Sequence, residues 1–362
     1  MRIAQVSPLW EQVPPPGYGG VELVVSRLTD ELVRRGHEVT LFASGDSQTL
    51  AKLEAICPKA IRLDTTVTEP AVYDLLEIQR VQNMADEFDV IHFHTNFTCL
   101  PFAEIMKTPV VHTLHGNFTE HNLKIFNQYC KQSFISISNA QRRKAPNLNY
   151  LSTVYNGINP EDYPFHPTPN DPPYLAFLGR MSPEKGPHHA IAIAKKSGWK
   201  LKMAGKVDKV DQDFFKEEIK PFIDGEQIEF LGEVTNQEKV ELMGNAAITL
   251  FPITWNEPFG LVMIESMCTG TPVIGMNLGS VPEVIASGKT GFICNNLEEM
   301  IEAIPAALKL ERQGCRDHVL TRFSIVQMVN GYEAAYEKAI DTAMLRDGHR
   351  KVPAQIASML VR

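Results

Sequence analysis

Apolar residues follow two patterns that alternate along most of the chain. A short apolar run at residues 3–6 predicts a buried strand. Between residues 21 and 35 apolar positions recur every three or four residues, which predicts a helix with one apolar face. Gly36 stands where helices commonly end, and residues 38–42 predict the next strand. The order strand, helix, strand indicates a parallel α/β sheet.

The same alternation continues on both sides of a proline-rich segment at residues 159–173. This segment carries six prolines, at positions 160, 164, 167, 169, 172 and 173, which neither a helix nor a central strand tolerates. We therefore predict two α/β domains, at residues 1–158 and 159–341, with a tail at about 342–362 that returns to the first domain. Further strands are expected at 89–93, 110–113, 133–137, 174–178, 200–204, 228–231 and 247–251, and a last helix at 324–346.

Composition narrows the class of protein. The 362 residues are 44% hydrophobic and 22% charged, and the net charge of −8 argues against a general nucleic-acid binder. Six scattered cysteines form no Cys-x-x-Cys pair, which suits a reducing compartment and excludes a disulfide framework. No apolar run approaches the roughly 20 residues needed to span a membrane, and the first residues do not form a signal peptide. We expect a cytoplasmic protein.

The stretch at residues 256–265 carries the strongest candidate chemistry. A strand ends just before it, Pro258 and Gly260 predict a tight turn, and a helical pattern begins at Leu261. The turn carries Glu257, and Glu265 lies two turns into the helix. Free N–H groups at a helix start bind anions, and carboxylates accept hydrogen bonds from sugar hydroxyls. The alternative is that Glu265 is a solvated helix residue and Glu257 is a charge favoured by the helix dipole.

A second candidate is the loop at residues 179–186, just after a predicted strand. It places Arg180 and Lys185 together, and a guanidinium and an ammonium that converge there suit a diphosphate. Two solvated surface cations are the alternative.

A glycine-rich loop follows the first strand and includes Gly19 and Gly20. A nicotinamide fingerprint would need glycine at position 22, which is Glu22, so that site is disfavoured. We expect the two glycines to let the backbone approach a ligand closely, with a flexible surface loop as the alternative.

Histidines gather at predicted strand ends. His115 falls just past one such end, from which its imidazole would reach a cleft. A zinc site is the alternative, but catalytic zinc usually needs three closely held ligands and no His-Glu-x-x-His helix is present. We predict no metal site. Three further candidates are disfavoured. They are a zinc site at His92, His94 and His112, and a sugar-transferase metal site at Asp211 and Asp213. The third is the P-loop-like run at 288–290, because a P-loop would need glycine at position 283, which is Glu283.

Taken together, these motifs resemble glycosyltransferase family 4, retaining enzymes with two facing Rossmann-like domains (the GT-B fold) and a deep cleft between them. The resemblance covers nearly the whole chain. Residues 1–47 resemble bacterial exopolysaccharide members, the cyanobacterial heterocyst-envelope transferases among them. The matching segments are 19–22, 115–116, 155–158, 179–186, 203–205, 231–234, 257–265, 275–283 and 288–292.

The resemblance implies a role for each candidate. Arg180 and Lys185 would hold the donor diphosphate, Glu265 the ribose, and Glu257 the transferred sugar. His115 would donate from its imidazole near that sugar. The remaining donor-binding positions are Gly19 and Gly20 against the phosphate, Gly205 and Val234 along the base, and Phe259, Gly260, Leu261 and Val262 at the start of the helix.

The implied activity is metal-independent transfer of a hexose to a polysaccharide or lipid-linked acceptor, with an α-glycosidic product. UDP-glucose is the expected donor, no cofactor is expected, and nucleic acid is not a partner. The basic run at residues 142–144 is compatible with peripheral contact with the inner membrane surface, although a solvated helix face is the simpler interpretation. The alternatives are a sugar-nucleotide isomerase on the same fold, a two-lobed solute-binding module and a nicotinamide oxidoreductase.

Overall fold

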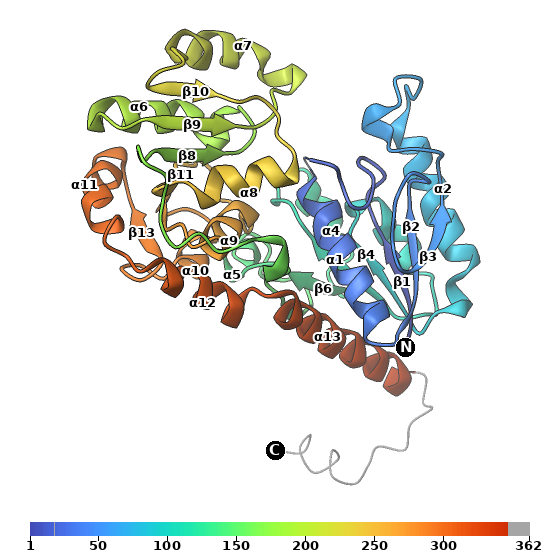
Figure 1. The fold of residues 1–362 in the computed structure, drawn as a ribbon. Coiled ribbons are helices and arrows are strands. Elements are labelled where there is room, and N and C mark those ends of the chain that lie inside the picture. The colour runs from blue at the N-terminus through green and yellow to red at the C-terminus, as the bar shows by residue number, and fades with distance from the viewer. Residues whose placement is uncertain (18, 347–362) are drawn as a thin grey trace.

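The computed structural model describes residues 1–17 and 19–346. Two parallel sheets, each covered by helices, form two lobes that face each other (Figure 1). The chain passes through the first lobe, then the second, and its last helix lies under the first lobe. The expected α/β architecture of two Rossmann-like domains, with a C-terminal helix returning to the first, is confirmed.

The first sheet has seven strands in the order β3-β2-β1-β4-β5-β6-β7. Five of them match predicted apolar runs. The two edge strands β3 and β7 escaped prediction because they are only partly buried and carry polar residues. The strands are β1 (Arg2–Val6), β2 (Glu38–Ala43), β3 (Lys52–Ala55), β4 (Val90–Phe93), β5 (Val110–Leu114), β6 (Ser133–Ser136) and β7 (Tyr150–Thr153).

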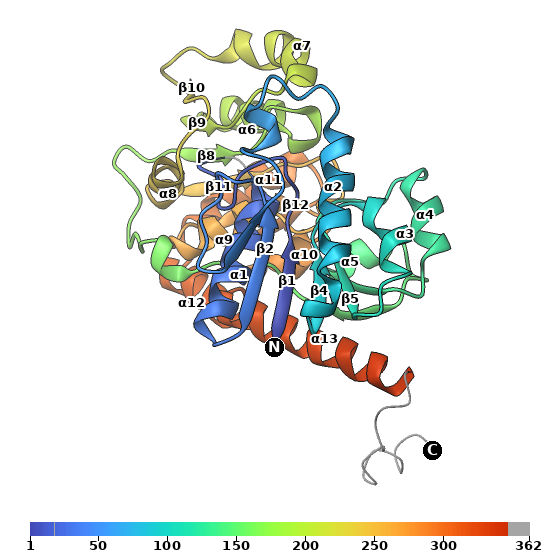
Figure 2. The same ribbon diagram turned by 90° about the vertical axis from the view of Figure 1, so that its right-hand side faces the viewer.

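Helices cover this sheet on both faces. α1 buries Val24, Leu28 and Leu32, the apolar face that its spacing predicts, against the sheet. α2 runs along the outside of the lobe (Figure 2). The helices are α1 (Gly20–Arg34), α2 (Pro70–Asn83), α3 (Leu100–Ala103), α4 (Asn122–Gln128) and α5 (Asn139–Arg142).

The second sheet has six strands in the order β10-β9-β8-β11-β12-β13. The strands are β8 (Leu175–Leu178), β9 (Leu201–Ala204), β10 (Ile228–Phe230), β11 (Ile248–Phe251), β12 (Val273–Met276) and β13 (Gly291–Cys294). β12 and β13 were not predicted as strands. The helices are α6 (Pro187–Ser197), α7 (Gln212–Phe214), α8 (Asn236–Gly244), α9 (Leu261–Cys268), α10 (Val281–Val284), α11 (Leu297–Ala307) and α12 (Arg312–Arg322).

Each sheet reverses its strand order at one place, which marks where a ligand would bind. In the first sheet β1 lies beside β4, and in the second β8 lies beside β11. Open α/β sheets bind ligands beyond the carboxyl ends of strands at such reversals. The loops that follow β1, β5, β8, β9 and β11 therefore surround the expected site.

The two connections between the lobes lie side by side. The backbone N–H of Ile158 donates to the carbonyl of Phe323 over 2.9 Å, and the N–H of Ile325 donates to the carbonyl of Ile158 over 2.8 Å. The proline-rich segment then follows the second lobe, where His166 and Asn170 donate backbone hydrogen bonds to Thr269 and Asn245, each over 2.9 Å. The segment is thus a fixed strap rather than a loose tether.

The return to the first lobe begins earlier than predicted. α13 (Ile325–Arg346) packs Met328, Tyr332 and Tyr336 into the same core as Ile3 and Val24 of the first lobe. The predicted boundary at 341/342 is therefore wrong, because the apolar stripe of this helix faces the first sheet from its first turn onward. Most of the predicted tail, residues 347–362, lies outside the described residues.

Candidate functional site

A cavity of about 370 Å³ lies between the two lobes at the carboxyl ends of both sheets. Every residue predicted for the donor site lines it. From the first lobe these are Gly19, Gly20 and His115, and from the second Arg180, Lys185, Gly205, Val234, Glu257, Phe259, Gly260, Leu261, Val262 and Glu265. Residues up to 246 positions apart in the chain thus share one cavity, as expected for loops at the ends of two facing sheets.

Lys185 and Glu257 form an ion pair at one end of the cavity. The Nζ of Lys185 lies 2.5 Å from Oε2 of Glu257, and Trp255 Nε1 donates to the same oxygen over 2.9 Å. The ammonium also lies 4.8 Å from the centre of the Trp255 ring. Lys185 is therefore held by two contacts, with Glu257 and with the Trp255 ring, and the alternative of a solvated surface cation is wrong for this residue.

Arg180 lies on the same loop among carboxylates. It bonds to Glu184 and lies 3.5 Å from both Asp208 and Asp211. Asp211, which resembled half of a metal motif, thus serves as a partner of Arg180, whereas Asp213 is exposed beside Lys216. These carboxylates orient the guanidinium at the cavity wall.

Gly205 fixes the distance between the two loops that flank Arg180. Its φ is +147°, and a Cβ added there would lie 1.8 Å from the carbonyl oxygen of Gly179. No larger residue fits this close approach of backbones. The loops after β8 and β9 are therefore pressed together along one wall of the cavity.

The start of α9 forms the floor of the cavity. Gly260 precedes the helix with a φ of +79°, a left-handed conformation that favours glycine, and Phe259 is buried beneath the turn. The first N–H groups of a helix have no partner within it, so those of Leu261 and Val262 can bind an anion. This matches the strand, turn and helix expected from the sequence.

Glu265 is 2% exposed, so the alternative of a solvated helix residue is wrong. Its Oε1 accepts hydrogen bonds from the Tyr163 hydroxyl over 2.7 Å and from Lys239 Nζ over 2.8 Å. Burial opposes ionisation of this carboxyl, but the Lys239 ammonium, Arg27 and Tyr163 together hold its pKa below the ordinary value. Glu265 is thus a buried carboxylate in its charged form.

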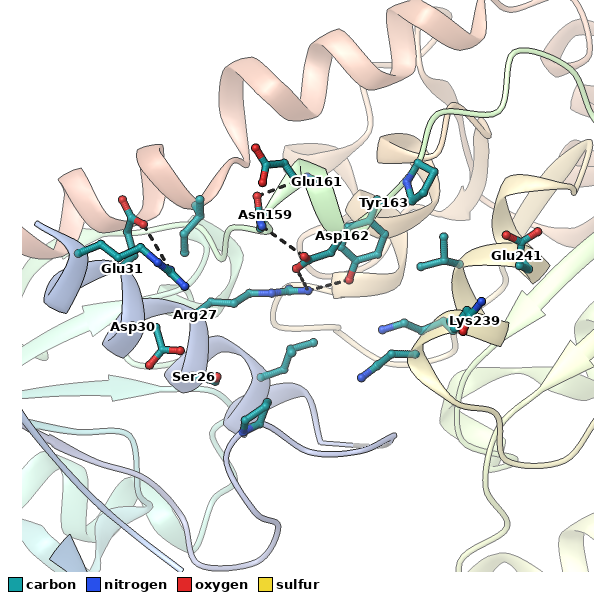
Figure 3. Close-up of a pocket in the computed structure, with 18 residues that line it drawn as sticks. Ser26, Arg27, Asp30, Glu31, Asn159, Glu161, Asp162, Tyr163, Lys239 and Glu241 are labelled. Atoms are coloured by element: carbon teal, nitrogen blue, oxygen red, sulfur yellow. Dashed lines mark hydrogen bonds and ion pairs between the residues drawn. The ribbon is translucent and has the colours of Figure 1, made fainter. Parts of the chain in front are cut away.

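A second cavity, of about 920 Å³, adjoins the first and shares Leu23 and Lys239 with it. Figure 3 shows Arg27 reaching from α1 toward Asp162 and Tyr163 of the strap. Arg27 Nη2 donates to the Tyr163 hydroxyl over 2.8 Å. The first lobe is thereby linked through Tyr163 to Glu265. Sequence reasoning missed Arg27, Tyr163 and Lys239, since none of them belongs to a local motif.

The first lobe contributes few charges to the cavity. Gly20, where α1 begins, faces α9, and a Cβ on it would make an ordinary van der Waals contact, 3.5 Å from Leu261 Cδ1. Glu22, two residues on, is buried, and burial raises its pKa to about 7. The glycine loop therefore meets the start of the opposite helix rather than lying free on the surface.

His115 follows β5, and its Nε2 lies 2.9 Å from Nδ1 of His94. Burial lowers the pKa of His115 to about 4, so its imidazole is neutral at physiological pH. Among the described residues no group of three or more histidine, cysteine or acidic side chains is placed to hold a metal ion.

The basic run at residues 142–144 does not form one face. Arg142 lies 4.4 Å from the centre of the Tyr150 ring and donates to Thr153, whereas Arg143 donates to the carbonyl of Gly279 in the other lobe. Within residues 1–17 and 19–346, no helix is long and apolar enough to cross a membrane. Peripheral membrane contact stays a prediction.

Two family models match the chain, one on each lobe. The model described as Glycosyltransferase Family 4 matches residues 18–162, and the model described as Glycosyl transferases group 1 matches residues 159–318. Together they span both walls of the cavity.

Individual proteins agree with these matches. An uncharacterized glycosyltransferase of Methanocaldococcus jannaschii is 25% identical over 337 residues, 81% of this chain and 84% of that protein. Glycogen synthase of Mycobacterium tuberculosis is 25% identical over 346 residues, with 81% and 82% covered.

Solved structures share the fold. AviGT4, a glycosyltransferase involved in avilamycin A biosynthesis, superposes with a TM-score of 0.71 at 25% identity, over 94% of this chain and 98% of that one. HepE of Anabaena, in complex with UDP and glucose, superposes with a TM-score of 0.72 at 21% identity, over 93% of this chain and all of that one.

Proposed function

Because the chain belongs to glycosyltransferase family 4, we propose that it transfers glucose from UDP-glucose to a saccharide or lipid-linked sugar with retention of configuration. One observation carries the proposal: a single interlobe cavity holds a basic loop, a helix N-terminus and two carboxylates. This set matches the parts of a nucleotide-sugar, which are a diphosphate and two hydroxyl-bearing rings.

The cavity has a sugar end and a ribose end in this proposal. Glu257 and His115 would contact the transferred sugar, and Glu265 would accept hydrogen bonds from the ribose hydroxyls. Arg180, Lys185 and the start of α9 would hold the diphosphate between them. Structures of HepE that contain UDP or UDP-glucose support this class of donor.

In the reaction, the bond between the anomeric carbon and the β-phosphate oxygen breaks as the acceptor hydroxyl attacks from the same face. The departing phosphate takes the proton of that hydroxyl, so atoms and charge balance without a further reactant. Lys185 and Arg180 stabilise the negative charge that develops on the phosphate. These positive groups take the electrostatic role that a divalent cation has in other transferases, so no metal or cofactor is needed.

The acceptor would enter beside Glu257. A third cavity, of about 320 Å³, shares Glu257 and Pro258 with the donor cavity and is lined by amides and by Arg143 and Lys144. An attacking hydroxyl must reach the sugar end, and this cavity adjoins it. We place the saccharide or lipid-linked acceptor there.

A nucleotide screen tests the donor first. Ligand binding raises the melting temperature by mass action, so UDP is expected to raise it more than GDP or ADP at equal concentration. Calorimetry with Lys185→Ala and Glu265→Ala should then show weakened UDP binding. Lys196→Ala is a matched control, because Lys196 is an exposed cation of the same lobe, paired with Glu298.

Product analysis tests the reaction. Incubation with UDP-glucose and an acceptor should give an α-linked product by NMR. Conversion of the donor alone to another sugar nucleotide would identify an isomerase instead. Unchanged UDP affinity in both alanine variants would show that the site is assigned wrongly.

A further inference from the structure

A buried chain of hydrogen bonds starts at His115 and runs away from the donor cavity. His115 Nε2 lies 2.9 Å from Nδ1 of His94, and His94 Nε2 lies 2.8 Å from Oε1 of Gln5. The amide nitrogen of Gln5 donates to the Tyr336 hydroxyl over 2.8 Å. The side chains of Gln5, His94 and Tyr336 are buried, so these bonds are shielded from water.

The hydrogen-bond chain continues from Tyr336 through His92 back to β5, the strand that His115 follows. The Tyr336 hydroxyl lies 2.7 Å from Nδ1 of His92, and His92 Nε2 lies 2.7 Å from Oγ1 of Thr113. It thus joins three neighbouring strands, β1, β4 and β5, to α13. The donor cavity is connected in this way to the helix that returns from the second lobe.

The amide of Gln5 sets the direction of donation along this chain of hydrogen bonds. Its nitrogen donates to Tyr336, so its oxygen accepts, and the proton of His94 must be on Nε2. Burial holds the pKa of His94 well below its ordinary value, which leaves the ring one proton. Nδ1 of His94 is therefore an acceptor.

The proton position on His94 also fixes the proton position on His115. Because Nδ1 of His94 accepts, Nε2 of His115 must donate to it. His115 is also neutral and carries one proton, so its Nδ1 holds a free lone pair. Nδ1 makes no hydrogen bond within the part of the chain that the structure describes, while the ring lines the donor cavity.

We propose that the chain from Tyr336 through Gln5 and His94 fixes the tautomer of His115, so that its Nδ1 presents a hydrogen-bond acceptor to the transferred sugar. The site then selects a sugar hydroxyl as the partner of His115. This reverses the donation that the family resemblance implied. It rests on the proposed function only in that the sugar lies at this end of the cavity.

The polarity suits the chemistry of the site. An acceptor nitrogen directs its lone pair toward the sugar, where positive charge develops on the anomeric carbon as the phosphate departs. A protonated imidazole would oppose that charge. Gln5, His94 and Tyr336 act through His115 and are positioning residues.

Nitrogen-15 NMR of histidine-labelled protein tests the tautomer without any turnover. We expect His115 in the wild type to carry its proton on Nε2, with Nδ1 showing the shift of a bare ring nitrogen. Tyr336→Phe removes the acceptor of the Gln5 amide, which frees the amide to rotate. The variant should show a mixture of the two His115 tautomers.

Tyr332→Phe is the matched control. Tyr332 is buried one turn earlier on α13, packs on His92 with ring centres 5.2 Å apart and lies beside Thr113, but it takes no part in the bonds from Tyr336 through Gln5 and His94 to His115. It should keep the wild-type spectrum. A wild-type His115 protonated on Nδ1, or identical spectra for the two variants, would overturn the proposal.

Gln5→Met gives the kinetic readout. It removes both polar contacts of the amide with little change in volume, so kcat should fall about 2- to 10-fold, the worth of one hydrogen bond. KM for UDP-glucose should stay within the error of wild type, because the diphosphate contacts are untouched. A rise of the same size in KM, with kcat unchanged, would contradict a role at the sugar.

Fluorinated donors identify the bond itself. Fluorine accepts hydrogen bonds weakly and donates none. At the sugar position whose hydroxyl bonds to His115, a fluoro analogue of UDP-glucose should therefore be as poor a substrate as the deoxy analogue. That penalty should disappear in His115→Ala. A fluoro analogue that restores activity at every position would overturn the proposal. If no UDP-sugar binds while the NMR result holds, the donor assignment fails and the tautomer stands.

Discussion

The two walls of the donor cavity are built from different chemistry. The second lobe supplies charges in pairs, such as Lys185 with Glu257 and Lys239 with Glu265. The first lobe supplies neutral groups, His115 and the glycine loop; Glu22, on α1 just after that loop, does not line the cavity, and burial raises its pKa to about 7. Under the proposed function, this difference divides the work: the charged groups would bind the diphosphate, and the neutral groups would orient the uncharged sugar.

The largest effect is expected from Lys185→Ala on the charged wall. It removes positive charge beside the leaving phosphate and leaves Glu257 without its ammonium, so kcat/KM should fall about 10²- to 10³-fold. Steady-state kinetics with UDP-glucose measure it, with Lys196→Ala as the unaffected control. A loss smaller than threefold would show that the charged wall does not act on the diphosphate.

Glu265→Gln tests the other charged pair at nearly constant shape. An amide cannot accept hydrogen bonds as strongly as a carboxylate, so the Kd of UDP should rise about 10- to 100-fold. Calorimetry with UDP and with 2′,3′-dideoxy-UDP separates the causes. The dideoxy nucleotide should bind both proteins equally, and a similar loss for both nucleotides would place Glu265 away from the ribose.

The same change from glutamate to glutamine at Glu22 of the first lobe should increase the stability of the protein at high pH. The pKa of Glu22 is raised from 4.5 to about 7 in the folded protein. Between those pH values the folded state binds more protons than the unfolded state, so the free energy of unfolding falls as pH rises through this window. At pH 8 Glu22→Gln should therefore be more stable than wild type, by on the order of 1–3 kcal/mol.

The gain should shrink as pH falls toward 4.5, below which Glu22 is protonated in both the folded and the unfolded state. Urea unfolding at pH 5 and pH 8 measures it. Glu265→Gln provides the contrast, since the lowered pKa of Glu265 makes its charge stabilising at pH 8. If Glu22→Gln were less stable than wild type at pH 8, the raised pKa assigned to Glu22 would be wrong.

The smallest effect is expected from metal removal. The basic loop and the start of α9 supply the positive charge at the diphosphate, so the rate with UDP-glucose should be unchanged by a chelator. Assays with EDTA, with and without added magnesium, test this. A loss of turnover that only magnesium or manganese restores would contradict the division between the walls.

The parts of the site that could be predicted are those written in continuous segments. Glu257 and Glu265 frame a turn and a helix start, and Arg180 and Lys185 share one loop, so local spacing was enough to pick out residues that line the cavity. Tyr163 left no such signal, because its partners Arg27 and Glu265 lie 136 and 102 positions away. Only packing of the two lobes brings such residues together.

The fold shows the same limit. Most buried central strands were recognised as apolar runs, although the buried central strand β12 was not, and the edge strand β3 is a partly exposed segment with polar residues. The spacing of α13 predicted its helix but not the lobe on which it packs, because an apolar stripe fits any complementary face.

The attachment of α13 to the first lobe has a consequence for how the protein is made. Residues from near both chain ends, Ile3 and Tyr336 among them, share one core. Domains usually fold as units while synthesis proceeds. Here the core of the first lobe cannot be completed until the ribosome has translated the second lobe and α13 has emerged. Until then Val24 and Leu28 are uncovered on one side. Removal of that helix should leave a newborn chain that depends on chaperones rather than a smaller working enzyme.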